Sequence, residues 1–166
     1  MGMGCLLGFF GILIGLIGYG ISILNLKSKA NSRANEIVST DPDLIKIPGS
    51  LVGGNHPLLG SIPQDVYLLL GKDELTILRF RSEEIVSFPL ECIKAEVSIE
   101  SAVSAAGIAL FGILALGAKQ RLLVLEVDDK QSQEQYKIVL KSNNDSFLAD
   151  KINKQRYNLL IARDKQ

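Results

Sequence analysis

The feature that most limits how this chain can fold is an uncharged, strongly apolar run over residues 3–26. Ser22 and Asn25 are the polar side chains that interrupt it, and both lie near its end. A helix of this length matches the thickness of a bilayer's hydrocarbon core. The run therefore predicts one transmembrane helix over residues 3–26, which would make the chain an integral membrane protein with the lipid bilayer as a partner.

Basic residues follow the apolar run at Lys27, Lys29 and Arg33. An excess of Lys and Arg marks the cytoplasmic flank of a membrane helix, so we expect a single-pass protein whose C-terminal domain is cytoplasmic. A cleaved signal peptide is the main alternative, but it would carry basic residues before a shorter apolar core. Myristoylation of Gly2 is disfavoured, because Leu6 stands where the motif wants Ser or Thr.

The glycines of the run are ordered in alternating steps of four and three. On a helix this spacing places small side chains along one narrow stripe, where a second helix can approach closely. The stripe predicts a helix-packing face for self-association or for another protein. It consists of Gly4, Gly8, Gly11, Gly15, Gly18 and Ser22, and Asn25 continues it.

The next stretch has the composition of a linker followed by turns. Residues 27–47 are polar and irregular, which predicts a polar linker. Residues 48–63 are rich in glycine and proline, which favours turns over a long regular element. The only histidine, His56, has no partner at the spacing of a metal site, and Cys5 and Cys92 lie far apart. We therefore expect no metal, no cofactor, no disulfide and no catalytic role for His56.

Short runs of strand-forming residues come next, separated by turn signals. Residues 93–100 alternate apolar and polar side chains, as in a strand with one face in a core and one in water. Residues 146–163 carry apolar side chains at helical spacing, which predicts a C-terminal helix. The expected strands cover residues 66–70, 74–80, 84–88, 93–100, 121–127 and 135–141, with a seventh at 44–47 or 51–52 left open.

A second uncharged apolar segment covers residues 102–118. It could cross a bilayer, form a helix or helical hairpin inserted between strands, or join the core. A crossing would separate the strands on its two sides, and a two-stranded remnant is only marginally stable. We therefore expect an inserted helix, which would offer Ala105, Ala109 and Gly112 to the glycine stripe.

These elements predict an α+β, mainly β domain over residues 48–166, a small barrel or sandwich closed at one end by the C-terminal helix. Residues 73–77 after a hairpin turn, residues 85–90, and Ile93 resemble the bacterial pleckstrin-homology-like (PH-like) and GRAM-like domains. The resemblance covers about residues 62–163. It implies a PH-like fold and a binding platform for lipid headgroups or proteins.

The charges narrow the predicted function. Equal numbers of basic and acidic residues, 18 of each, and the absence of Trp argue against nucleic-acid binding. In the hairpin turn Lys72 is the only basic residue and is followed by Asp73 and Glu74, so a specific lipid headgroup is not expected. No catalytic motif is present. The sequence predicts a non-enzymatic, membrane-anchored binding or scaffolding module; the alternative is a structural or assembly subunit of a larger membrane complex, packed through the glycine stripe.

Overall fold

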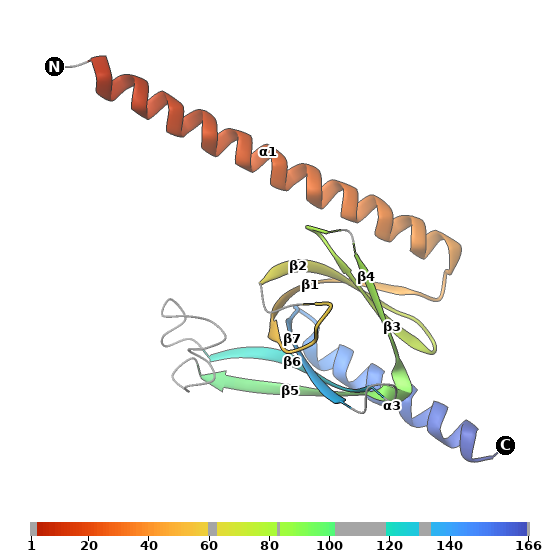
Figure 1. Ribbon diagram of the computed structural model, residues 1–166. Coiled ribbons are helices and arrows are strands. Elements are labelled where there is room, and N and C mark those ends of the chain that lie inside the picture. The colour runs from red at the N-terminus through yellow and green to blue at the C-terminus, as the bar shows by residue number, and fades with distance from the viewer. Residues whose placement is uncertain (1–2, 60–62, 83, 102–118, 130–133, 166) are drawn as a thin grey trace.

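The computed structural model describes residues 3–59, 63–82, 84–101, 119–129 and 134–165, without the side chains of residues 3–17, 100–101 and 119–120 (Figure 1). Its elements follow one another in a simple order, a long helix, seven strands and a final helix. They are α1 (Met3–Thr40), β1 (Ile45–Gly54), β2 (Gln64–Leu70), β3 (Glu74–Arg79), β4 (Ile85–Pro89), the 3-10 turn η1 (Leu90–Cys92), β5 (Ile93–Ser101), β6 (Lys119–Asp129), β7 (Glu134–Lys141) and α3 (Asp145–Asp164).

The described strands form one antiparallel sheet in the order β4-β3-β2-β1-β7-β6-β5. The sheet is open, with β4 and β5 at its edges, and Figure 1 shows β1–β4 lying over β5–β7. One cluster of buried apolar side chains draws members from every one of these strands and from α3. The two halves of the bent sheet therefore enclose a single core. The predicted closed barrel or two-sheet sandwich is wrong, because the strands remain one sheet with two free edges.

The predicted transmembrane helix over residues 3–26 is also wrong. Within the part of the chain that the structure describes, no helix is long and apolar enough to cross a membrane. Residues 3–26 are the first part of α1, which continues through polar residues to Thr40. The apolar run is thus not a separate element, and the polar linker expected over 27–47 is largely helix. This finding also overturns the predicted single-pass membrane localisation with a cytoplasmic C-terminal domain.

Strand β1 occupies much of the region in which the sequence indicates turns. Pro48 lies in this strand, opposite Tyr67 of β2, but pairing with β7 begins only at Ser50. Pro48 therefore sits where β1 has one neighbour, a position at which a missing N–H is tolerated. The register with β7 shifts between Leu51 and Gly53, so the glycines accommodate a β-bulge.

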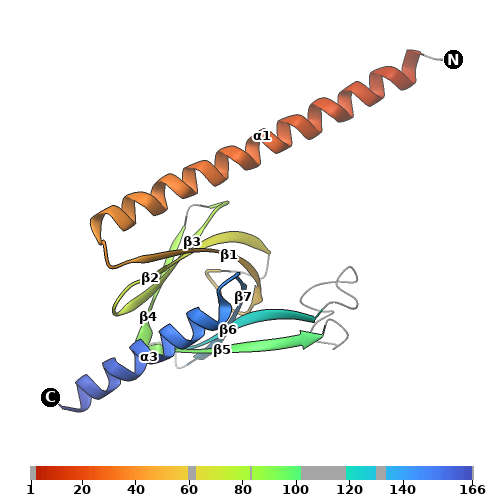
Figure 2. The same ribbon diagram turned by 180° about the vertical axis from the view of Figure 1, so that it is seen from behind.

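Helix α3 covers the edge of the sheet formed by β5. It lies against β5, β6 and η1, as the view from behind shows (Figure 2). The side-chain amide of Asn153 accepts a hydrogen bond from the backbone N–H of Ala95 (3.1 Å) and donates one to its carbonyl oxygen (2.7 Å). One side chain thus imitates a neighbouring strand at this point, which satisfies backbone groups that an edge leaves unpaired.

Helix α1 covers the face of β2 and β3 that points away from the core. Val66, Leu68 and Leu70 of β2 belong to the core, whereas the alternate residues Tyr67 and Leu69 point to the opposite face. There they form a second apolar cluster with side chains of α1 and β3. The other members of this cluster are Ala30, Ala34, Leu78 and Phe80, with Ile37 and Val38 packed against it.

Polar contacts join α1 to the sheet beside this cluster. Lys46 Nζ of β1 donates hydrogen bonds of 2.6 Å to the side-chain oxygens of Asn31 and Asn35. The same ammonium group lies 4.4 Å from the centre of the Tyr67 ring, and the Tyr67 hydroxyl donates to Asn31 Oδ1 over 3.2 Å. Burial lowers the pKa of Lys46. These contacts fix the rotation of α1 as well as its position.

We expect Ala34→Leu to destabilise the protein by about 1–3 kcal/mol, because the fully buried Ala34 leaves no room for a larger side chain between α1 and β2. Urea denaturation of the full chain measures the change in the free energy of unfolding. Ser32→Leu is the matched control, since Ser32 is exposed on the same helix and its replacement should change stability by less than about 0.5 kcal/mol. Equal effects of the two substitutions would contradict close packing at Ala34.

Candidate functional site: a histidine pocket and the exposed face of α1

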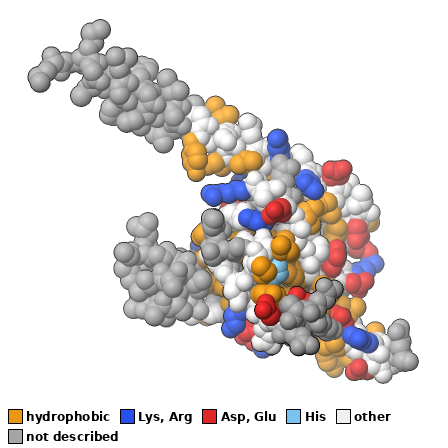
Figure 3. Space-filling view, viewed as in Figure 1, with side chains coloured by type: hydrophobic (Ala, Val, Ile, Leu, Met, Phe, Trp, Pro, Cys, Tyr) orange, Lys and Arg blue, Asp and Glu red, His pale blue; other side chains and the backbone are white. Residues whose placement is uncertain are grey.

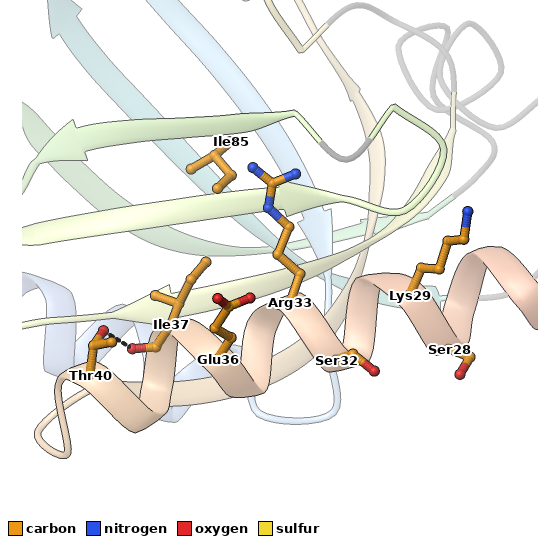
Figure 4. A pocket seen from close by; sticks show the side chains of 8 residues that line it. All are labelled: Ser28, Lys29, Ser32, Arg33, Glu36, Ile37, Thr40 and Ile85. Carbon is orange, nitrogen blue, oxygen red and sulfur yellow. Dashed lines mark hydrogen bonds between the residues drawn. The ribbon is translucent and has the colours of Figure 1, made fainter.

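The basic residues Lys27, Lys29 and Arg33 that follow the apolar run do not share one surface in the structure. Lys29 and Arg33 line an open groove of about 770 Å³ between α1 and the edge strand β4. Figure 4 shows Arg33 and Ile37 extending from the helix toward Ile85 of β4, while Ser28 and Ser32 point away from the strands. Lys27 lines a different hollow, beside Phe80 and Arg81.

The glycine stripe lies along the projecting part of α1. Gly18 and Ser22 are exposed, and a Cβ added to Gly18 would meet no atom within 4 Å. Gly4, Gly8, Gly11 and Gly15 belong to the same helix, in the part whose side chains are not described. Ala105, Ala109 and Gly112 of the predicted insert lie outside the described residues.

Large apolar side chains lie on the same part of α1 as Gly18 and Ser22. Tyr19 is 63% exposed, Ile21 53%, Ile23 46% and Leu24 67%. At 100° per residue Tyr19 and Ile23 lie on one side of the helix, and Ile21 and Leu24 lie on the other. In Figure 1 the N-terminal part of α1 extends beyond the sheet. Ile23 borders the hollow beside Phe80, and all four side chains keep nearly half or more of their surface exposed.

A second candidate site is built around His56, at the end of β1. The backbone N–H of Asn55 donates to the carbonyl oxygen of Lys137 (3.0 Å), and the N–H of Lys137 donates to Asn55 Oδ1 (2.6 Å). Gly54, which precedes Asn55, has a φ of 141°, and a Cβ on Gly54 would overlap the carbonyl oxygen of Lys137. Only glycine fits this close approach. The segment that carries His56 is therefore held rigidly against β7.

The loop beyond His56 is held from the other side. Arg79 Nη1 of β3 donates to the carbonyl oxygen of Leu58 over 2.9 Å and forms an ion pair of 2.6 Å with Glu84. Leu59, the next residue, is fully buried in the core. Both ends of the segment 55–59 are thus attached to the sheet.

His56 is buried, with 8% of its surface exposed. Its centroid lies 5.0 Å from that of Phe88 on β4 and 4.9 Å from that of Tyr136 on β7, both in edge-to-face arrangements. Nδ1 of His56 is buried and has no hydrogen-bond partner among the residues that the structure describes. A buried polar atom without a partner costs on the order of 1–3 kcal/mol, so a group that satisfies it would be stabilising.

Burial lowers the pKa of His56 below its ordinary value of 6.5, and the charge of Asp129 opposes this effect. The imidazole is therefore neutral at neutral pH, with one nitrogen able to accept a hydrogen bond. Neutral histidine is also a metal ligand, but no cluster of three His, Cys, Asp or Glu side chains that could hold an ion occurs among the described residues.

His56 lines a pocket of about 480 Å³ where the bent sheet brings β4 close to the end of β6. The pocket falls in the size range of small-molecule sites. Figure 3 shows the histidine side chain among hydrophobic side chains and beside acidic ones. Its walls come from the loop after β1, from β4, from η1 and from β6. The apolar lining residues are Leu58, Val86, Phe88, Pro89 and Val127, and the polar ones are Ser87, Glu91, Cys92, Asp128 and Asp129.

This pocket could not be predicted from the sequence patterns. There His56 resembles a loop residue without a partner, because its partners are rings contributed by distant strands and not metal-like ligands. The signal that was present is local: two glycines and an asparagine precede His56, and a proline follows it. Such residues allow a backbone to approach another strand closely.

Comparison with known proteins found a solved structure that is similar to this chain, but it did not identify a family. No protein-family model matches the chain, and no curated protein matches it. Among solved structures, the crystal structure of the C-terminal domain of an unknown protein from Leishmania infantum is similar with a TM-score of 0.46 and 10% sequence identity. The match covers 76% of this chain and 97% of that one.

We expect the free energy of unfolding to decrease as the pH falls below about 6.5. The unfolded chain binds a proton on His56 in this range, whereas burial lowers the pKa of the folded state. The folded state therefore loses stability as the pH falls, and above this range His56 does not contribute to the pH dependence of stability. Because His56 is the only histidine, urea denaturation of the wild type and of His56→Gln at about pH 7.5 and about pH 5.5 isolates its contribution. Equal pH dependence in both proteins would contradict the lowered pKa.

Proposed function

We propose that this chain is a non-enzymatic binding or scaffolding module that associates with a second copy of itself through α1. The observation that carries the proposal is the exposure of Tyr19, Ile21, Ile23 and Leu24 on opposite sides of one helix. A helix that is apolar all round is normally buried. Leaving a large apolar side chain in water forgoes roughly 1.5–3 kcal/mol of burial free energy, so a partner surface is favoured here.

The chemistry of α1 supports an identical helix as the partner. The described part from Gly18 to Leu26 carries no charged side chain, so two copies would approach without repulsion. Gly18, Gly20 and Ser22 alternate with the large side chains, and a Cβ on either glycine would meet nothing within 4 Å. Small residues between large ones allow two helices to interdigitate.

The helix is attached to the β domain in a way that suits scaffolding. α1 has 38 residues and is therefore about 57 Å long. Its second half is fixed on β2 and β3 through Ala30 and Ala34, so the exposed segment keeps one direction relative to the sheet. Association through that segment would place two β domains at a defined separation.

The resemblance to PH-like and GRAM-like domains remains part of this proposal. The pair β6–β7 followed by α3 supplies the strand pair and the terminal helix that the resemblance requires. The hairpin between β2 and β3 carries Lys72 beside Asp73 and Glu74, which favours a protein over an anionic lipid headgroup as the ligand of that surface.

Sedimentation of the full chain over a range of concentrations tests the proposal. We expect a reversible dimer or higher oligomer, and we expect Leu24→Glu to weaken association by about tenfold or more, because a charge would be desolvated in an apolar interface. Ser28→Glu is the matched control, since Ser28 is exposed one turn further along α1.

Two results would contradict self-association through α1. One is a monomer at every concentration for the wild type. The other is an oligomer that Leu24→Glu and Ser28→Glu leave equally intact. Crosslinking in intact cells tests the alternative that α1 binds a different protein. Such a partner would be crosslinked to the wild type and to Ser28→Glu but not to Leu24→Glu.

A further inference from the structure

The described chain covers one edge of the sheet and leaves the other open. Helix α3 lies against β5, whereas β4 pairs only with β3 among the described strands. Three alternate residues of β4, Ile85, Ser87 and Pro89, are exposed. An open edge presents unpaired backbone groups to which another strand can add. The sheet can therefore be extended at β4 but not at β5.

The register between β3 and β4 shows which backbone groups of β4 point to the open side. The N–H of Arg79 donates to the carbonyl oxygen of Glu84 (3.0 Å), and the N–H of Leu90 donates to that of Asp73 (2.8 Å). Glu84 and Leu90 therefore both face β3. The backbone groups of successive residues in an antiparallel pair point alternately toward the partner strand and away from it. The residues of β4 whose backbone groups face away from β3 are therefore Ile85, Ser87 and Pro89.

These outward groups form a short row of hydrogen-bonding positions. Ile85 and Ser87 each offer an N–H and a carbonyl oxygen, whereas Pro89 offers a carbonyl oxygen only. None of these groups bonds to another backbone group of the described residues. The row ends at Pro89, because proline has no N–H to donate.

We propose that this edge binds an extended peptide segment of another protein, which adds to the sheet as a strand beside β4. Donors and acceptors at the spacing of a strand are matched by an extended backbone, so these groups select a polypeptide. The added strand would place every second side chain beside Val86 and Phe88. Both residues line the pocket of about 480 Å³, so the pocket would receive an apolar side chain of the peptide.

The charges around β4 favour a basic segment over a second copy of this chain. None of the described residues that line the pocket is Lys or Arg, and the exposed Asp128 lies on the wall that β6 contributes. In the sequence, β4 lies between Glu84 and Glu91, so a second β4 would bring further carboxylates to this edge. A segment that carries Lys or Arg beside its apolar residues is complementary in charge.

Amide hydrogen exchange of the full chain, followed by nuclear magnetic resonance, tests for the added strand. The probe is the alternating peptide acetyl-Lys-Val-Thr-Val-Thr-Val-Lys-amide, whose residues favour strands. We expect about 1 mM peptide to slow exchange at the N–H groups of Ile85 and Ser87, which it would bond. The N–H groups of Val86 and Phe88 face β3 and should change less. Unchanged exchange at Ile85 and Ser87 would overturn the proposal.

Two substitutions at Ser87 separate the backbone contact from the side chain. Ser87→Pro removes the outward N–H, at a position of an edge strand where proline is tolerated. Ser87→Ala is the matched control, because both variants lose the hydroxyl that lies 2.7 Å from Thr76 Oγ1 but alanine keeps the N–H. We expect Ser87→Ala to bind the peptide like the wild type and Ser87→Pro to bind roughly fivefold more weakly, as for one lost hydrogen bond. Equal binding by the two variants would contradict pairing at this edge.

Should Ser87→Pro fail to fold, the same question is decided by changing the peptide. One modified peptide is N-methylated at its Val residues and another at its Thr residues. Because alternate N–H groups of a strand face the same neighbour, we expect one of these peptides to bind like the parent and the other to lose binding. Equal binding of both modified peptides and the parent would show contact without strand pairing and would overturn the proposal.

Two further comparisons test the nature of the partner. Replacing both Lys residues of the peptide with Glu should weaken its binding, and equal binding would contradict a basic partner. The second comparison omits the peptide and varies the protein concentration. If exchange at Ile85 and Ser87 slows as the protein concentration rises, a second copy occupies the edge and the proposed peptide partner is wrong.

Discussion

The contact between α1 and the outer face of β2 and β3 is the constraint on which the arrangement of the molecule depends. These two strands are buried on both sides, with the core beneath them and Ala30 and Ala34 of α1 above. Without the helix, Tyr67, Leu69 and Leu78 would face water, at a cost of roughly 1.5–3 kcal/mol for each large side chain. Strands β2 and β3 thus lie between α1 and the core, and α1 is part of the fold and not an appendage to it.

This contact also determines what α1 presents to other molecules. Lys46 and Tyr67 fix the rotation of the docked half through Asn31 and Asn35. Because one continuous helix runs from Met3 to Thr40, the exposed segment around Tyr19–Leu24 inherits that orientation. A partner bound there would be held at a fixed angle to the sheet, which a flexible linker over 27–47 would not allow.

The sequence was informative where the signal is local. The alternation in residues 93–100 indicated β5, and the unbroken apolar run of residues 66–70 marks a strand buried on both faces. It was misleading where the outcome depends on distant partners. Pro48, Gly53 and Gly54 resemble turn residues, but pairing with β2 and β7 keeps them in a strand. Composition alone also does not reveal that the apolar N-terminal run and the polar residues after it share one helix.

The histidine pocket was beyond the reach of sequence patterns for the same reason. Asn55 and Lys137, whose hydrogen bonds position His56, are 82 residues apart in the chain. The pocket and the α1 groove both use residues of β4. Ile85 lines the groove beside α1, whereas Val86 and Phe88 line the pocket. One short edge strand thus contributes to two surfaces, Ile85 at its start to the groove and the residues after it to the pocket. The groove and the pocket share no lining residue, so a group bound at one would not compete for side chains at the other.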